Sequence, residues 1–266
     1  MNTALAILAH ALRMLVFEVS TTLRVLMPAL ALVMGCSLGI ALLAPDTVAM
    51  MNTPPEEIVA PAPGSLLAFV VLGAVGLLGY ALMAVLWHRH VLLNGAERTE
   101  ALRPGGSVFF GYLWRAIVVG FVQLLASIPV VLAMGVLGAV FIGGAASGVA
   151  TAAIGLVGGL VFVWLALRFS VVLPAAALGH IIPVRESWQL TSVVSTELWG
   201  VALLLTGLNM FIYALSEALL PAAGGVALLA QTAIFIVEGL VFVSVLTTLY
   251  GHLVEGRSLG QERGTE

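Results

Sequence analysis

Six long runs of apolar residues divide the chain, and each is close to the length of about 20 residues that a helix needs to cross a bilayer. They lie near residues 25–44, 65–87, 116–140, 150–173, 198–219 and 227–250. A β-barrel would instead show segments of about ten residues with alternating hydrophobicity. Because lipid cannot satisfy free backbone N–H and C=O groups, the pattern predicts an all-α integral membrane protein with six transmembrane helices arranged as three hairpins.

A shorter segment before each hairpin is predicted to form an interfacial amphipathic helix. These segments lie at about residues 3–20, 106–115 and 184–197. In the first, Leu5, Leu8 and Leu12 fall on one helical stripe and His10 and Arg13 lie away from it, which is typical of a helix on the membrane surface. The order of a surface helix followed by a hairpin occurs three times and predicts an internal repeat of roughly 80–90 residues.

The composition agrees with a single polytopic membrane domain covering residues 1–266. Only 9% of the residues are charged and 61% are hydrophobic, whereas a soluble domain has roughly 25% charged residues. All ten basic residues are arginines, and all fall on the side of the membrane that holds the N-terminus. The opposite loops carry acidic residues: Asp46, Glu56, Glu57 and Glu217. The positive-inside rule therefore predicts that the N- and C-termini are cytoplasmic.

Three polar residues within the predicted spans form a candidate intramembrane cluster. Glu238 lies near the middle of the last span, Asn209 near the middle of the fifth, and Gln123 about a third of the way along the third. A carboxylate at the bilayer centre costs roughly 2.5–3.5 kcal/mol, so Glu238 is expected to face the bundle interior. Two interpretations stay open: a proton or substrate site, or hydrogen-bonded packing between helices worth about 1 kcal/mol.

Four arginines at the cytoplasmic ends of the spans form a candidate lipid-headgroup site, namely Arg89, Arg115, Arg168 and Arg185. A guanidinium group binds phosphate bidentately, so converging arginines would hold an anionic phospholipid. The alternative is that the long side chain of Arg168 extends to the headgroup layer as an ordinary anchor.

No cofactor, metal site or nucleic-acid partner is expected from the residue pattern. Cys36 has no intrachain partner, and the spacing of His88 and His90 directs the two side chains about 200° apart on a helix. Their expected role is that of interfacial anchors. The pairs Gly35/Gly39 and Gly155/Gly159 form small-residue faces that allow close helix approach. These faces serve internal packing or, alternatively, a homodimer or a larger membrane complex.

A resemblance to a known family rests on two segments: Leu165-Ala-Leu-Arg168-Phe-Ser170-Val-Val-Leu-Pro174-Ala-Ala-Ala and Arg185-Glu-Ser187-Trp188-Gln-Leu-Thr191. Together with Trp87-His-Arg-His-Val-Leu-Leu, they resemble the membrane domain of bacterial glycerophosphoryl diester phosphodiesterases and related stand-alone six-helix membrane proteins. The resemblance covers about residues 80–200 and implies six helices and an inner-membrane location. The catalytic barrel of the fused members is expected to be missing, so no catalytic residue is carried over.

These observations favour a non-enzymatic membrane protein, either an accessory or scaffold subunit or a lipid-organising factor that binds anionic phospholipid. The alternative is a small transporter or channel-like protein that uses Glu238. A membrane-embedded enzyme is the third class, and the sequence shows no catalytic set that supports it.

Overall fold

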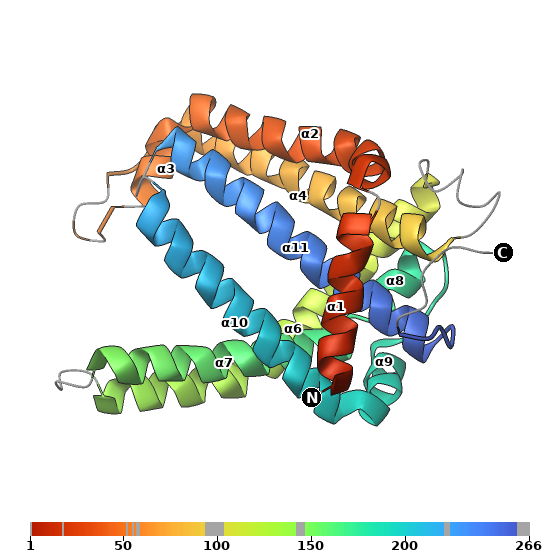
Figure 1. Cartoon of the computed structure of the whole chain (residues 1–266). Coiled ribbons are helices and arrows are strands. Elements are labelled where there is room, and N and C mark those ends of the chain that lie inside the picture. Colours follow the sequence, from red (N-terminus) through yellow and green to blue (C-terminus); the bar gives the residue numbers. More distant parts are fainter. Residues whose placement is uncertain are drawn as a thin grey trace.

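The computed structural model describes residues 2–17, 19–51, 53, 54, 56, 59–93, 104–141, 147–220 and 224–259. Within these ranges the regular elements are helices (Figure 1). They are α1 (Asn2–Phe17), α2 (Val19–Leu43), α3 (Pro45–Met51), α4 (Pro63–Leu92), α6 (Gly106–Phe141), α7 (Ser147–Phe169), α8 (Val172–Ala177), α9 (Val184–Leu190), the 3₁₀ turn η2 (Thr191–Val194), α10 (Ser195–Leu219) and α11 (Gly225–Leu253). The prediction of an all-α chain is confirmed for the described residues.

Six of the helical segments are long and apolar enough to cross a membrane. They are Val19–Leu43, Pro63–Leu92, Gly106–Val140, Gly148–Ala177, Val184–Leu219 and Gly225–Leu253. Each corresponds to one of the six predicted spans, and all but the first predicted span, which ends one residue later at Ala44, lie wholly within them. The chain is therefore a multi-pass membrane protein with six transmembrane helices.

The second predicted surface helix is not a separate element. Residues 106–115 form the first part of α6. The whole helix has 36 residues and is thus about 54 Å long at 1.5 Å per residue. Proline is the strongest helix breaker, and the first one in α6 is Pro129. The third predicted surface segment is divided differently from the expectation, because α9 and η2 are followed by α10 from Ser195 onward.

The spans share two ends, which we call the turn end and the arginine end. Helices α2, α6 and α10 finish at the turn end, where α4, α7 and α11 begin (Figure 1). The described arginines lie toward the opposite, arginine end: Arg13, Arg24, Arg89, Arg115, Arg168, Arg185 and Arg257. The separation of charge predicted from the sequence is thus present along the bundle.

The two helices of the third predicted hairpin, α10 and α11, are not a closely packed antiparallel pair. Helix α11 packs on α2 and α4, whereas α10 packs mainly on α7, which is paired with α6. Figure 1 shows α10 and α11 diverging from the turn end. Helix α1 contacts both of them, so it fills the space that the divergence creates at the arginine end.

Helix α1 buries a different stripe from the leucine stripe seen in the sequence. Ala4, Ile7 and Ala11 are 0–2% exposed and belong to a core formed with residues of α10 and α11. Leu5 and Leu12 are 48% and 37% exposed. Ala4, Ile7 and Ala11 therefore pack against the protein with Leu8 partly buried beside them, while Leu5 and Leu12 remain available to lipid.

Glycines allow close packing of α2 on α4. A Cβ atom added at Gly79 would lie 3.0 Å from Val33 Cγ2, and one added at Gly39 would lie 3.0 Å from a methyl group of Leu72. Gly39 and Gly79 therefore serve helix packing within the protein. A Cβ atom at Gly35 or Gly155 would have nothing within 4 Å.

Candidate functional site

The structure brings together two of the three residues of the predicted intramembrane cluster. The side-chain amide Nδ2 of Asn209 on α10 donates a hydrogen bond of 3.0 Å to Oε1 of Glu238 on α11. Glu238 lies 13 residues after the first residue of α11 and 15 before its last, so it is central in its span. The pair links α10 and α11 at the depth where a carboxyl group is most costly to place in lipid.

Gln123 does not join this pair, and that part of the prediction is wrong. Its Nε2 donates to the backbone oxygen of Phe162 on α7 at 2.9 Å, and Ser127 Oγ donates to the backbone oxygen of Gln123 at 2.6 Å. The reason is the tertiary arrangement, because α6 packs on α7 and α8 and not on the α10–α11 side of Glu238. Gln123 joins α6 to α7.

Two aromatic side chains, Tyr80 of α4 and Phe235 of α11, pack next to Glu238 along α11. The hydroxyl and ring of Tyr80 on α4 occupy the space where a Cβ atom at Gly239 would lie. The ring of Tyr80 also lies 5.1 Å from that of Phe235. Gly239 is therefore required for the close approach of α4, and this contact fixes the rotation of α11 next to Glu238.

A line of polar residues extends from the Asn209–Glu238 pair along both helices. Residues three, four or seven positions apart share one helix face, so the side of α10 that carries Asn209 also carries Thr206, Tyr213 and Ser216. Gln231 lies seven residues before Glu238 on α11. We call these six residues the polar stripe: Thr206, Asn209, Tyr213, Ser216, Gln231 and Glu238.

The polar stripe is open for much of its length. Asn209 and Gln231 are exposed, and Tyr213 is 65% exposed. Thr206 is buried, and its Oγ1 has no hydrogen-bond partner among the described residues. Sequence reasoning found only the central pair. The signals for the remaining residues are the seven-residue spacing of Gln231 and Glu238 on α11 and the three-, four- and seven-residue spacings of Thr206, Tyr213 and Ser216 from Asn209 on α10.

Arg168 is not exposed to the headgroup layer, as a lipid contact or an anchor would require. It is 4% exposed, and its Nη2 and Nη1 donate to the backbone oxygens of Trp188 and Thr191 at 2.9 and 3.5 Å. Its guanidinium carbon lies 4.0 Å from the centre of the Trp188 ring and 5.4 Å from that of Trp164. Arg168 therefore stabilises the carbonyl end of α9, where the helix dipole favours a cation.

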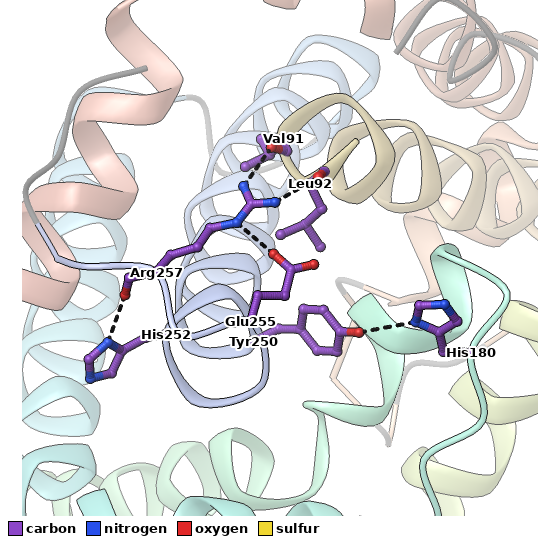
Figure 2. A network of polar contacts seen from close by, with 7 residues as sticks. All are labelled: Val91, Leu92, His180, Tyr250, His252, Glu255 and Arg257. Atoms are coloured by element: carbon purple, nitrogen blue, oxygen red, sulfur yellow. Dashed lines mark hydrogen bonds and ion pairs between the residues drawn. The ribbon is translucent and has the colours of Figure 1, made fainter. Parts of the chain in front are cut away.

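Two further arginines satisfy the carbonyl ends of other helices in the same way. Arg89 donates to the backbone oxygen of Ala177, the last residue of α8, at 2.9 Å. Arg257 donates to the backbone oxygens of Val91 and Leu92 at the end of α4, at 3.4 and 2.7 Å, and its Nε pairs with Glu255 at 2.6 Å (Figure 2). From the sequence, Arg257 was predicted only to lie on the cytoplasmic side with the other arginines.

The four arginines predicted to bind lipid thus have separate environments. Arg115 donates to the backbone oxygen of Gly111 on its own helix at 3.0 Å, and Arg185 is exposed at the start of α9. Arg89 and Arg168 are already bonded to helix carbonyls. Only Arg115 and Arg185 therefore remain candidates for a phospholipid contact.

The histidines near the arginine end are more buried than predicted for interfacial anchors. His88 is 0% exposed and His90 is 6% exposed. His88 Nδ1 lies 2.8 Å from Thr247 Oγ1 on α11. Among the described residues, no group of three or more His, Cys, Asp or Glu side chains is arranged to hold a metal ion.

A small pocket of about 40 Å³ lies beside the Arg257 network. His10 of α1, Thr247 and His252 of α11, and the tail residue Ser258 are among its lining residues. Figure 2 shows His252 directed to the backbone oxygen of Arg257, which lies 3.0 Å from Nδ1. The pocket has room for a few water molecules at most, and its polar groups hold the C-terminal segment against α4 and α11.

The two segments that carry the sequence resemblance lie in contact. Besides the bonds of the Arg168 guanidinium, Ser187 Oγ donates to the backbone oxygen of Arg168 at 2.8 Å. Arg168 and Ser187 therefore join the end of α7 to α9. No protein-family model matches the chain, and neither a curated protein nor a solved structure matches it.

Proposed function

We propose that this membrane protein is a small transporter or channel-like protein that binds a proton or a small cation at Glu238. The observation that carries the proposal is the hydrogen bond between Asn209 and Glu238 in the middle of two spans. Ionisable residues within spans are rare and commonly mark ion or proton pathways, and polar residues that lead to Glu238 fit such a pathway. Here Gln231 and Tyr213 continue the line toward the turn end.

The geometry changes the balance between the two functions considered from the sequence. The phospholipid-binding scaffold depended on four arginines, and two of them are bonded to helix carbonyls. Both interpretations of Glu238, a proton or substrate site and packing between helices, expected a polar partner from another span, and Asn209 is that partner. The polar residues that continue from this pair toward the turn end favour the transporter. The amide satisfies one carboxyl oxygen, which lowers the cost of keeping Glu238 in the bilayer.

Flux measurements in proteoliposomes test the proposal. Glu238→Gln retains a hydrogen-bonding group and the side-chain shape but removes the titratable oxygen. We expect this variant to fold and to lose proton or monovalent-cation flux driven by a pH or potassium gradient. Glu186→Gln is the control, because Glu186 is an exposed carboxyl group in the first turn of α9, at the arginine end and outside the polar stripe. A folded Glu238→Gln protein with unchanged flux would exclude the role of Glu238.

An accessory or scaffold subunit that contacts anionic phospholipid is the second candidate. The favouring observation is the small buried share of the spans, which is 17% for the most apolar window of α6 and 22% for that of α11. Such surfaces suit lipid or the helices of a partner. Co-purification of a stoichiometric membrane partner, together with no flux from the isolated protein, would favour this candidate.

The arrangement in the membrane belongs to the proposal as well. The described arginines lie toward one end of the bundle, and acidic residues such as Asp46 and Glu217 lie toward the other. By the positive-inside rule, the arginine end and both termini are cytoplasmic in a bacterial inner membrane. The turn end then faces the extracytoplasmic side.

A further inference from the structure

The polar stripe gives Glu238 a route to one side of the membrane. Polar side chains within a membrane protein normally face a water-filled space or one another, because lipid offers them no hydrogen bonds. Tyr213 and Ser216 on α10 and Gln231 on α11 lie between Glu238 and the turn end, on the faces that the Asn209–Glu238 bond turns toward each other. They place hydroxyl and amide groups along this half of the hairpin, and Ser216 Oγ donates to the backbone oxygen of Tyr213 at 2.8 Å.

A second observation at the inner end of the stripe also indicates a ligand or water. Thr206 Oγ1 is buried and has no partner among the described residues, although it lies one turn from Asn209 on the same face. An unpaired buried hydroxyl costs roughly 1–3 kcal/mol unless water or a ligand satisfies it. The stripe therefore ends at a position where an additional hydrogen-bonding species is needed.

Charge at the turn end selects the species that would enter. Asp46 in the first turn of α3 and Glu217 in the last turn of α10 lie at this end, while the described arginines lie toward the other. Acidic groups at the mouth of a low-dielectric passage concentrate cations and repel anions. The stripe itself carries one carboxyl group and no basic side chain.

The route ends at Thr206, one turn past the Asn209–Glu238 pair toward the arginine end. Toward the arginine end, the facing residues of α10 and α11 are apolar, as in Leu205 and Val245, and they form one core with Ala4 and Ile7 of α1. A Cβ atom added at Gly200 would lie only 2.8 Å from the Cβ of Ala4. Helix α1 is therefore packed closely across this part of the hairpin.

We propose that the polar stripe is a water-accessible half-channel through which protons or small monovalent cations reach Glu238 from the turn end, and that α1 closes it beyond Glu238. The inference rests on the proposed function, because it supplies the access route for the same carboxyl group. The half-channel also accounts for the open third hairpin. Helix α1 packs between α10 and α11 toward the arginine end, and the polar stripe toward the turn end is left uncovered.

Cysteine labelling in proteoliposomes tests the half-channel without measuring flux. In a Cys36→Ser background, Ser216→Cys and Gln231→Cys report the stripe, and Leu215→Cys and Ala233→Cys are controls at matching depth on other faces of α10 and α11. A thiol reacts as the thiolate, which forms in water and not in lipid. We expect a cationic methanethiosulfonate reagent to modify the stripe positions roughly tenfold faster than the controls, and faster than an anionic reagent does.

The results separate this inference from the proposed function. If the stripe and control positions react at equal rates, the half-channel is excluded, even if Glu238→Gln abolishes flux. If the stripe positions react faster but Glu238→Gln leaves flux unchanged, the water route stands and the role of Glu238 fails. An anionic reagent that reacts as fast as the cationic one contradicts the selection of cations.

The closing role of α1 has its own test. Leu205→Cys lies beyond Glu238 and is 9% exposed in the native protein, so we expect it to be unreactive. Ile7→Asn places a polar side chain in the α1 core contact and is expected to make Leu205→Cys reactive. Leu5→Asn, on the exposed side of α1, is the control and should leave it unreactive. Reactivity of Leu205→Cys with native α1, or no change with Ile7→Asn, would overturn the closing role.

Discussion

Replacing Arg168 tests the finding that buried arginines hold the helix ends together. The informative variant is Arg168→Met, because methionine keeps an unbranched apolar chain of similar reach and removes only the guanidinium group. The variant loses the 2.9 Å bond to the Trp188 carbonyl and the longer 3.5 Å bond to the Thr191 carbonyl. It also loses the contact of the cation with the Trp188 ring at 4.0 Å.

The expected cost follows from these contacts. A hydrogen bond from a charged donor contributes about 2 kcal/mol when well formed and about 0.5 kcal/mol at the longer distance. A cation over a buried indole adds about 2 kcal/mol. Against this, Arg168 Nε is buried without a partner, and removing it returns roughly 1–2 kcal/mol. We therefore expect Arg168→Met to lower the free energy of unfolding by about 3 kcal/mol.

Reversible unfolding in mixed detergent micelles measures this change, followed by tryptophan fluorescence. The fluorescence is informative because the Trp164 ring contacts those of Trp188 and Trp199, with centroids 5.6 and 4.7 Å apart. Arg185→Met is the matched control on the exposed start of α9 and should change stability by less than about 0.5 kcal/mol. If Arg168→Met were as stable as this control, the desolvation cost of the buried cation would equal its contacts, and the stabilising role would be refuted.

Three further predictions concern stability, topology and lipid. Glu238→Leu should weaken helix association by about 1 kcal/mol relative to Glu238→Gln, measured by unfolding in micelles, and equal stabilities would show that the hydrogen bond contributes nothing. A reporter fused after Pro55 should be active on the extracytoplasmic side and one fused after Gly95 on the cytoplasmic side; the reverse result would overturn the orientation inferred from arginine. In native mass spectrometry, Arg115→Gln and Arg185→Gln should each retain less cardiolipin than the native protein, and equal retention would remove the lipid contact.

The class of the protein and its six spans were predictable from the sequence because lipid imposes a simple physical condition. A segment that crosses hydrocarbon must satisfy its own backbone and bury few charges, so the spans appear as uninterrupted apolar runs. Depth along a span is also readable from residue number, and Asn209 and Glu238 at the centres of consecutive spans do meet. The apolar runs and the depth of a residue along its span both follow from the residues within one segment and from contact with the lipid.

The lateral arrangement of the helices was decided only by the tertiary structure. Gln123 lies within a span, as Asn209 does, but it bonds to α7 because α6 packs there. Arg168 has the sequence context of an interfacial anchor, yet the carbonyl end of α9 lies within its reach and binds it. Every span is apolar on most of its surface, so hydrophobic periodicity does not identify its neighbour.

In helix α1, the sequence determined one part of the structure and the tertiary packing determined another. Its sequence predicted a helix with a leucine stripe and a polar side, and both are present. The packing of Ala4 against Gly200 depends on α10 and α11 diverging far enough to admit a helix. That divergence arises from which helices α10 and α11 pack on, and side-chain fit between segments distant in the chain determines it.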